Sequence, residues 1–115
     1  MRKSYRVKRE RDFQQVFHKG QSCANRNFIV YQISKPQQTH FRVGLSVGKK
    51  VGNAVTRNAV KRKIRQALLE EKGHIRPTID FIIIARPQAA NLTMSEVKKN
   101  IEHVLKVAKI YEIGQ

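Results

Sequence analysis

The chain has 115 residues, of which 40% are hydrophobic and 7% aromatic, which suits one domain with a modest aliphatic core. It carries 24 Lys and Arg against 8 Asp and Glu, a net charge of +16 that predicts a polyanionic partner, nucleic acid before an anionic membrane surface. Cys23 is the single cysteine, which argues against a disulfide framework or a thiolate metal site and fits a reducing cytoplasm. No apolar run approaches the ~20 residues that a transmembrane helix needs.

The first segment of the chain is basic. We expect residues 1–9 to form a flexible arm that orders on a polyanion, although the same composition suits an ordinary disordered terminus. A short helix is predicted over Asp12–Lys19, because Phe13, Val16 and Phe17 have helical spacing and Gly20 can end it.

Two strands come next. The β-branched and aromatic run within Asn27–Ser34 predicts the first, and a turn over Lys35–Thr39 leads to the second, over residues 41–47. In the second strand large apolar residues alternate with Arg42, Gly44 and Ser46, so one face would form a shallow floor with a charge at one end. We expect the two strands to pair as an antiparallel hairpin.

A glycine-punctuated loop with Lys49 and Lys50 leads into a basic helix that Asn53 should cap and that ends near Lys72 and Gly73. Positions four apart share a helix face, so this helix should carry a ridge of cations beside an apolar stripe. The ridge and its flank comprise Arg57, Asn58, Lys61, Arg62 and Arg65. Guanidinium forks match phosphate oxygens, which suits a nucleic-acid backbone.

The last predicted elements are a buried strand over Asp80–Ala85 and a helix that starts at a capping box, Thr93 to Glu96, and runs to about Ala108. The order α-β-β-α-β-α predicts an α+β sandwich of one small sheet with helices, in a single domain over residues 1–115. The basic helix and the last strand would make a β-α-β unit, for which general sterics favour a right-handed crossover.

Acidic residues are absent from residues 13–69, which contain 11 Lys or Arg. A block of one charge sign predicts an interaction surface rather than a solvated face. The four histidines and the carboxylates show no spacing typical of a metal site or of general acid–base catalysis, so we assign no residue of this chain to catalysis or to metal binding. The composition favours a binding protein whose partner supplies the chemistry.

These residues together resemble a known family. The run from Gly44 to Gln66, with Asp12–Phe17 upstream and Phe81–Arg86 downstream, is similar to the signature of the bacterial ribonuclease P protein subunit, and the similarity extends from about Val7 to Tyr111. The resemblance implies a single α/β sandwich of the ribosomal protein S5 domain 2-like type with a left-handed β-α-β crossover, against the general expectation.

The resemblance also implies a function. Members of the family join a catalytic RNA in a ribonucleoprotein endonuclease that removes the 5′ leader of precursor tRNA. The RNA and its bound Mg²⁺ perform the hydrolysis, while the protein binds the leader and needs no protein partner or membrane.

Carried onto this chain, the resemblance divides the site residues into two sets. The catalytic-RNA-binding set is Lys49, Lys50, Arg57, Asn58, Lys61, Arg62 and Arg65. The leader-binding set is Phe13, Phe17, Tyr31 and Ser46. Alternatives stay open at this stage: Phe13 and Phe17 have the pattern of core residues, Tyr31 of an ordinary strand aromatic, and Asn58 of a local hydrogen-bonding residue. A ribosomal-type RNA-binding or RNA-chaperone protein without enzyme activity is the competing function.

Overall fold

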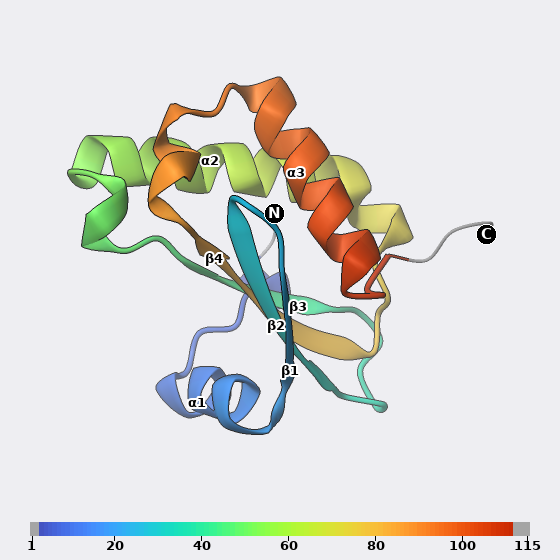
Figure 1. Cartoon of the computed structure of the whole chain (residues 1–115). Coiled ribbons are helices and arrows are strands. Elements are labelled where there is room, and N and C mark those ends of the chain that lie inside the picture. Colours follow the sequence, from blue (N-terminus) through green and yellow to red (C-terminus); the bar gives the residue numbers. More distant parts are fainter. Residues whose placement is uncertain (1–2, 112–115) are drawn as a thin grey trace.

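A computed structural model describes residues 3–111 and shows one four-stranded sheet with helices on both faces (Figure 1). The strands are β1 (Gln21–Ala24), β2 (Phe28–Ser34), β3 (Arg42–Ser46) and β4 (Ile79–Ala85), in the spatial order β1-β2-β4-β3. The main helices are α1 (Glu10–Lys19), α2 (Ala54–Glu71) and α3 (Met94–Val107). This confirms the predicted α+β sandwich. No helix within residues 3–111 is long and apolar enough to span a bilayer.

The hydrophobic core lies between the sheet and the layer formed by α2 and α3. Alternate strand residues such as Val30, Val43 and Phe81 meet the apolar stripes of the two helices, represented by Ile64 and Ile101. These residues are at most 4% exposed, so the spacing of apolar side chains in the sequence fixes which face of each element is buried. The predicted caps are present as well: Asn53 accepts from Thr56 N–H, and Thr93 and Glu96 form the capping box.

The opposite face of the sheet is covered only in part, by α1 (Figure 1). Val16 is fully buried there, whereas Phe13 and Phe17 are half-buried. One short helix cannot cover four strands, so this face is covered unevenly: Arg42 and Ser46 of the predicted floor are partly exposed, whereas Gly44 is buried beneath Phe13.

The strand pairing differs from the predicted hairpin. β2 and β3 do not pair; β4 lies between them, antiparallel to β2 and parallel to β3. The central position suits β4, because its side chains form a continuous apolar run. Such a strand is most stable where other strands flank it and other elements cover both faces of the sheet. The parallel pairing of β3 and β4 around α2 confirms the predicted β-α-β unit, and the left hand that the resemblance implies for it stays a prediction.

A strand was also missed. β1 pairs antiparallel with β2 at the sheet edge, so the observed order is α-β-β-β-α-β-α. Its sequence, Gln-Ser-Cys-Ala, carries no apolar alternation, because an edge strand that is mostly exposed has no buried face to encode. Cys23 therefore lies within an edge strand and is a free thiol.

The basic N-terminal segment is docked rather than free over residues 3–7. Arg6 forms a parallel bridge with Val43, Val7 N–H donates to Val43 O at 3.0 Å, and the Val7 side chain is 5% exposed. In this structure, residues 3–7 therefore lie on the sheet, with the Val7 side chain as a buried apolar anchor. The flexibility of the arm and its ordering on a polyanion stay predictions. Met1 and Arg2, which belong to the same predicted arm, lie outside the described residues.

Candidate RNA interface

The open face of the sheet is built from three rows of side chains that cross β2, β4 and β3. The pairing register aligns Tyr31, Ile82 and Gly44 in the central row. The neighbouring rows are Ile29–Ile84–Ser46 on one side and Ile33–Asp80–Arg42 on the other. Since alternate residues of a strand share a face, all nine positions point toward the side of α1. The result is a mostly apolar floor with an ion pair at one end.

Aromatic side chains of α1 stand against this floor. The Phe17 ring meets the Tyr31 ring edge-on, with centroids 5.2 Å apart, and Phe13 lies 6.5 Å from Phe17. Phe13 also lies over Gly44, where a missing side chain leaves room for the ring. Phe13, Phe17, Tyr31 and Ser46 are all partly exposed, and they lie on the side of the sheet that α1 partly covers. We call this strip between α1 and the sheet the aromatic cleft.

An ion network holds the start of α1 to the floor. The Arg42 guanidinium binds the buried Asp80 carboxylate through two hydrogen bonds, with Nε 3.0 Å from Oδ1, and its Nη1 lies 3.7 Å from Asp12 Oδ2. Hydrogen bonding to Asp80 raises the pKa of Arg42, against a smaller opposing effect of burial. Arg42 is therefore charged throughout the physiological range, and its bonds fix α1 at one end of the cleft.

The second set of predicted residues lies on α2 and on the loop before it. Lys49 and Lys50 are exposed in the short helix η2 (Lys49–Val51). On α2, Asn58 and Arg62 are exposed, and Arg57, Lys61 and Arg65 are half-buried. Within residues 3–111 none of the six cations is ion-paired with an acid, and Arg57 Nε is buried without a hydrogen-bond partner. This set therefore forms a row of cations with no partner inside the described part of the chain.

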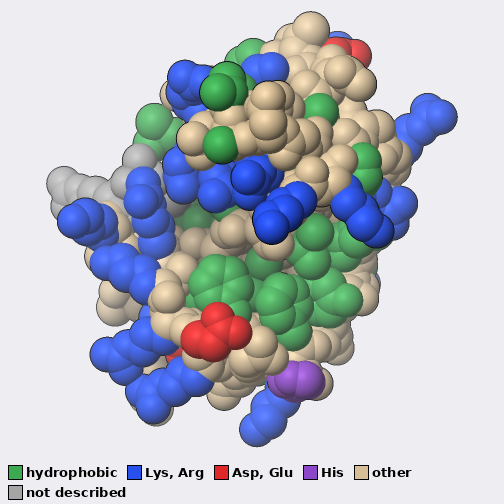
Figure 2. All heavy atoms as spheres, turned by 90° about the vertical axis from the view of Figure 1, so that its left-hand side faces the viewer, with side chains coloured by type: hydrophobic (Ala, Val, Ile, Leu, Met, Phe, Trp, Pro, Cys, Tyr) green, Lys and Arg blue, Asp and Glu red, His purple; other side chains and the backbone are tan. Residues whose placement is uncertain are grey.

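The cleft and the cations share one side of the molecule. Figure 2 shows Lys and Arg side chains in a band across this side, with a patch of hydrophobic side chains directly below the band. Single-stranded nucleic acid can use both features, because its phosphates bind cations and its unpaired bases stack on aromatic or apolar side chains. The geometry thus suits single-stranded nucleic acid better than a duplex, whose bases are already stacked and paired.

Sequence reasoning missed several members of this surface. Ile29 and Ile84 contribute to the floor, and the half-buried Arg86 follows Ile84 by two residues in extended conformation and so continues the same face. Arg86 Nε is buried and has no hydrogen-bond partner among residues 3–111. The apolar run of β4 predicts a strand that is buried on both faces. The alternation of residues from Ile84 to Arg86, beyond the end of this run, is the sequence signal that would have placed Arg86 on the exposed face.

Comparison with known proteins identifies the family of the chain. The family model described as Ribonuclease P matches residues 1–109 of the chain. The chain belongs to the Ribonuclease P family. A curated relative in this family, the ribonuclease P protein component of Enterococcus faecalis, is 66% identical over 115 residues, which cover 100% of this chain and 98% of the relative.

Solved structures of the family agree with the observed fold. The ribonuclease P protein of Staphylococcus aureus superposes with a TM-score of 0.89 at 46% identity, covering 96% of this chain and 100% of that one. The ribonuclease P protein of Thermotoga maritima gives a TM-score of 0.81 at 28% identity, covering 89% and 96% of the two chains. The family resemblance expected from the motifs is therefore confirmed across nearly the whole chain.

Proposed function

We propose that this chain is the protein subunit of a ribonuclease P, which binds the catalytic RNA through the α2 cations and the 5′ leader of precursor tRNA through the aromatic cleft. The observation that carries this proposal is the placement of an open cleft with Phe17 and Tyr31 beside a row of unpaired cations. Membership of the Ribonuclease P family supports the same function, since the relatives are named as protein components of that enzyme.

The two surfaces have different tasks in this proposal. Arg57, Lys61 and Arg65 recur every four residues, about 6 Å apart along the helix axis, and would follow the phosphates of a folded RNA. The cleft would hold unpaired leader bases, with stacking on Tyr31 or Phe17 contributing about 1–3 kcal/mol per base. The leader would lie in the cleft and the catalytic RNA along α2. The protein would therefore hold the substrate next to the catalytic RNA.

Catalysis is proposed to reside on the RNA. Residues 3–111 contain no group of three His, Cys, Asp or Glu side chains placed to hold a metal ion. The carboxylates nearest the cleft, Asp12 and Asp80, already face Arg42, so this site does not fit Mg²⁺, which prefers free oxygen ligands. We therefore propose that Mg²⁺ is held mainly by the RNA subunit and the substrate.

A reconstitution assay tests the function. The purified chain is mixed with a bacterial ribonuclease P RNA and precursor tRNA at a Mg²⁺ concentration at which the RNA alone is slow. We expect faster cleavage at the 5′ end of the mature tRNA sequence. An unrelated protein of similar size and charge serves as the control for simple charge neutralisation.

The competing function predicts a different result. A ribosomal-type RNA-binding or RNA-chaperone protein would bind both RNAs with strong salt dependence but would raise cleavage no more than the charge-matched control. Equal rates with the two proteins would contradict our proposal.

A further inference from the structure

An open recess of about 350 Å³ lies beside the segment that connects β2 to β3. Its lining consists of Ser4, Gln37, Gln38, Thr39, His40 and Arg42. The volume falls within the ~300–1,000 Å³ of clefts that hold small organic groups. The lining combines one aromatic ring with amide and hydroxyl groups and contains no Asp or Glu. The recess therefore offers a flat face and polar groups without a negative charge.

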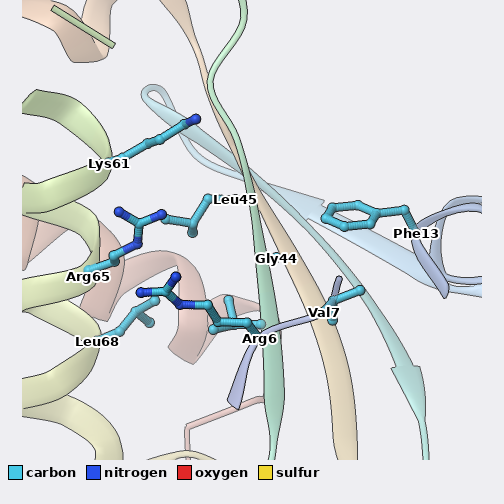
Figure 3. Close-up of a pocket in the computed structure, with 9 residues that line it drawn as sticks. Arg6, Val7, Phe13, Gly44, Leu45, Lys61, Arg65 and Leu68 are labelled. Atoms are coloured by element: carbon cyan, nitrogen blue, oxygen red, sulfur yellow. The ribbon is translucent and has the colours of Figure 1, made fainter. Parts of the chain in front are cut away.

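The N-terminal segment supports the aromatic ring of this recess from behind. The Tyr5 ring stacks on the His40 ring, with centroids 4.1 Å apart and planes 25° apart, and Lys72 Nζ lies over the Tyr5 ring at 4.2 Å. The next residue, Arg6, is directed toward Arg65 of α2 instead (Figure 3). Tyr5 thus covers one face of the half-buried His40 ring, and the rest of that ring lines the recess.

Hydrogen bonds also fix the connecting segment. Gln38 Nε2 donates to Ile79 O at 3.1 Å and to His40 O at 3.3 Å, which ties the segment to β4. His40 Nδ1–H donates to Phe41 O at 2.8 Å, because a carbonyl oxygen only accepts. The imidazole ring therefore has a set orientation, and a group that stacks on it would lose little binding energy to ordering the protein.

Polar groups around the ring remain available. Gln37 is exposed, and its side chain makes no hydrogen bond to any residue in the range 3–111. A side-chain amide carries both a donor and an acceptor, which is the combination that the edges of unpaired nucleobases present. The recess therefore has a stacking face at His40 and a group at Gln37 that can pair with the edge of a stacked base.

We propose that this recess binds an unpaired nucleobase of an RNA strand, which stacks on His40 and is hydrogen-bonded at its edge by Gln37. Stacking accepts every base, because every base has a π face, whereas the Gln37 amide would give a preference among bases. A duplex does not fit the recess, since its bases are already stacked and paired.

The recess lies beyond one end of the aromatic cleft. Arg42, which ends the floor, lines both the recess and a second hollow of about 190 Å³ with Arg9 and Asp12 at the start of α1. His40 precedes Gly44 by four residues, about 13 Å along an extended chain. A strand that leaves the cleft past Arg42 would reach His40. That the strand is the 5′ leader depends on the proposed function, whereas the recess itself does not.

The test is an NMR titration of the full chain with single-stranded RNA long enough to reach from the cleft to the recess, without catalytic RNA. We expect saturable shifts of the His40 ring protons. His40→Ala should weaken binding about fivefold or more, because one base loses its stacking partner. His40→Phe keeps an aromatic face and should retain the affinity. Gln37→Ala, at an exposed position, should change the order of preference among bases.

His74→Ala is the matched control, because His74 also stacks on a tyrosine, with its ring centroid 5.2 Å from that of Tyr111, but does not line the recess. It should leave the affinity unchanged. Equal weakening by His74→Ala and His40→Ala, or unchanged affinity in His40→Ala, would overturn the site.

Two further ligands test the class of partner. The same RNA in duplex form should not shift the His40 ring protons, and equal shifts with the duplex would contradict stacking of an unpaired base. A nucleoside monophosphate should bind more weakly than the strand, and equal affinity would refute the assignment to an RNA strand. Because no cleavage is measured, this test can fail while the reconstitution assay succeeds, and the reverse.

Discussion

The ring of Phe13 lies so close to the backbone of Gly44 that a Cβ at position 44 would stand 2.7 Å from two ring carbons. Non-bonded carbons prefer about 3.5–4.0 Å, so only glycine allows this approach. The contact packs α1 against β3. It therefore fixes how closely the Phe13 ring of α1 approaches the sheet.

Gly44→Ala is therefore expected to displace the Phe13 ring. Because that ring is half-buried and can rotate away, the free energy of unfolding should fall by only about 1–3 kcal/mol, the usual range for overpacking. Affinity for precursor tRNA with a leader should fall, while affinity for tRNA without a leader should not. Urea unfolding and a binding titration with both RNAs measure these effects.

Gly48→Ala is the matched control. A Cβ at Gly48 meets no atom within 4 Å, and its φ of −81° suits any residue. A loss of leader affinity as large in this variant as in Gly44→Ala would contradict the role of the Phe13 contact.

Replacing Tyr31 or Phe17 with Ala tests base stacking in the cleft. Each change should weaken binding of leader-bearing substrate by about 1–3 kcal/mol, because an unpaired base loses an aromatic face. Substrate without a leader should bind as before. The measurement is the dissociation constant for a matched pair of substrates at fixed salt.

Phe17→Leu separates stacking from simple burial. Leucine keeps apolar volume beside Tyr31 but offers no aromatic face, so leader affinity should fall although the protein stays folded. Equal weakening for substrates with and without a leader, in either alanine variant, would refute the cleft assignment.

Arg62→Ala tests the cationic row on α2. Arg62 is exposed, so its loss should leave the free energy of unfolding nearly unchanged. Association with the catalytic RNA should weaken, and the slope of log K against log salt should become shallower by about 0.7–0.9 if one phosphate contact is lost. Lys99→Ala on α3 is the control, and an identical change of slope there would mean that total charge, not position, governs binding.

The capping box of α3 predicts a pH dependence. Hydrogen bonds from the backbone and side chain of Thr93 hold the pKa of Glu96 below its usual value of 4.5. A lowered folded-state pKa gives stability that is present above the unfolded pKa and is lost as pH falls through the folded pKa. Glu96→Gln should therefore unfold with a weaker pH dependence as the pH falls below about 5, where the wild-type protein loses this contribution. Identical pH profiles for the two proteins would exclude this contribution.

The sequence by itself determined the elements with strong local signals. The i, i+3, i+4 spacing of Phe13, Val16 and Phe17 predicted α1, and the alternation around Gly44 predicted a strand with one thin face. The four-residue spacing of Arg57, Lys61 and Arg65 predicted a ridge of cations on a helix, and the acid-free block marked it as an interaction surface, whereas the aromatic cleft came from the family resemblance. These signals are local, because they depend on helical and strand periodicity and on capping residues close in the chain.

Only the tertiary structure decided how the elements combine. The order β1-β2-β4-β3 depends on competition among strands for the covered centre of the sheet, which neighbouring residues do not encode. Arg6 and Val7 dock on β3, and Arg42 pairs with Asp80. Both contacts join residues that are far apart in the chain. The residue types and their periodicity thus fixed the chemistry of the surface, whereas long-range packing fixed which of those groups act together.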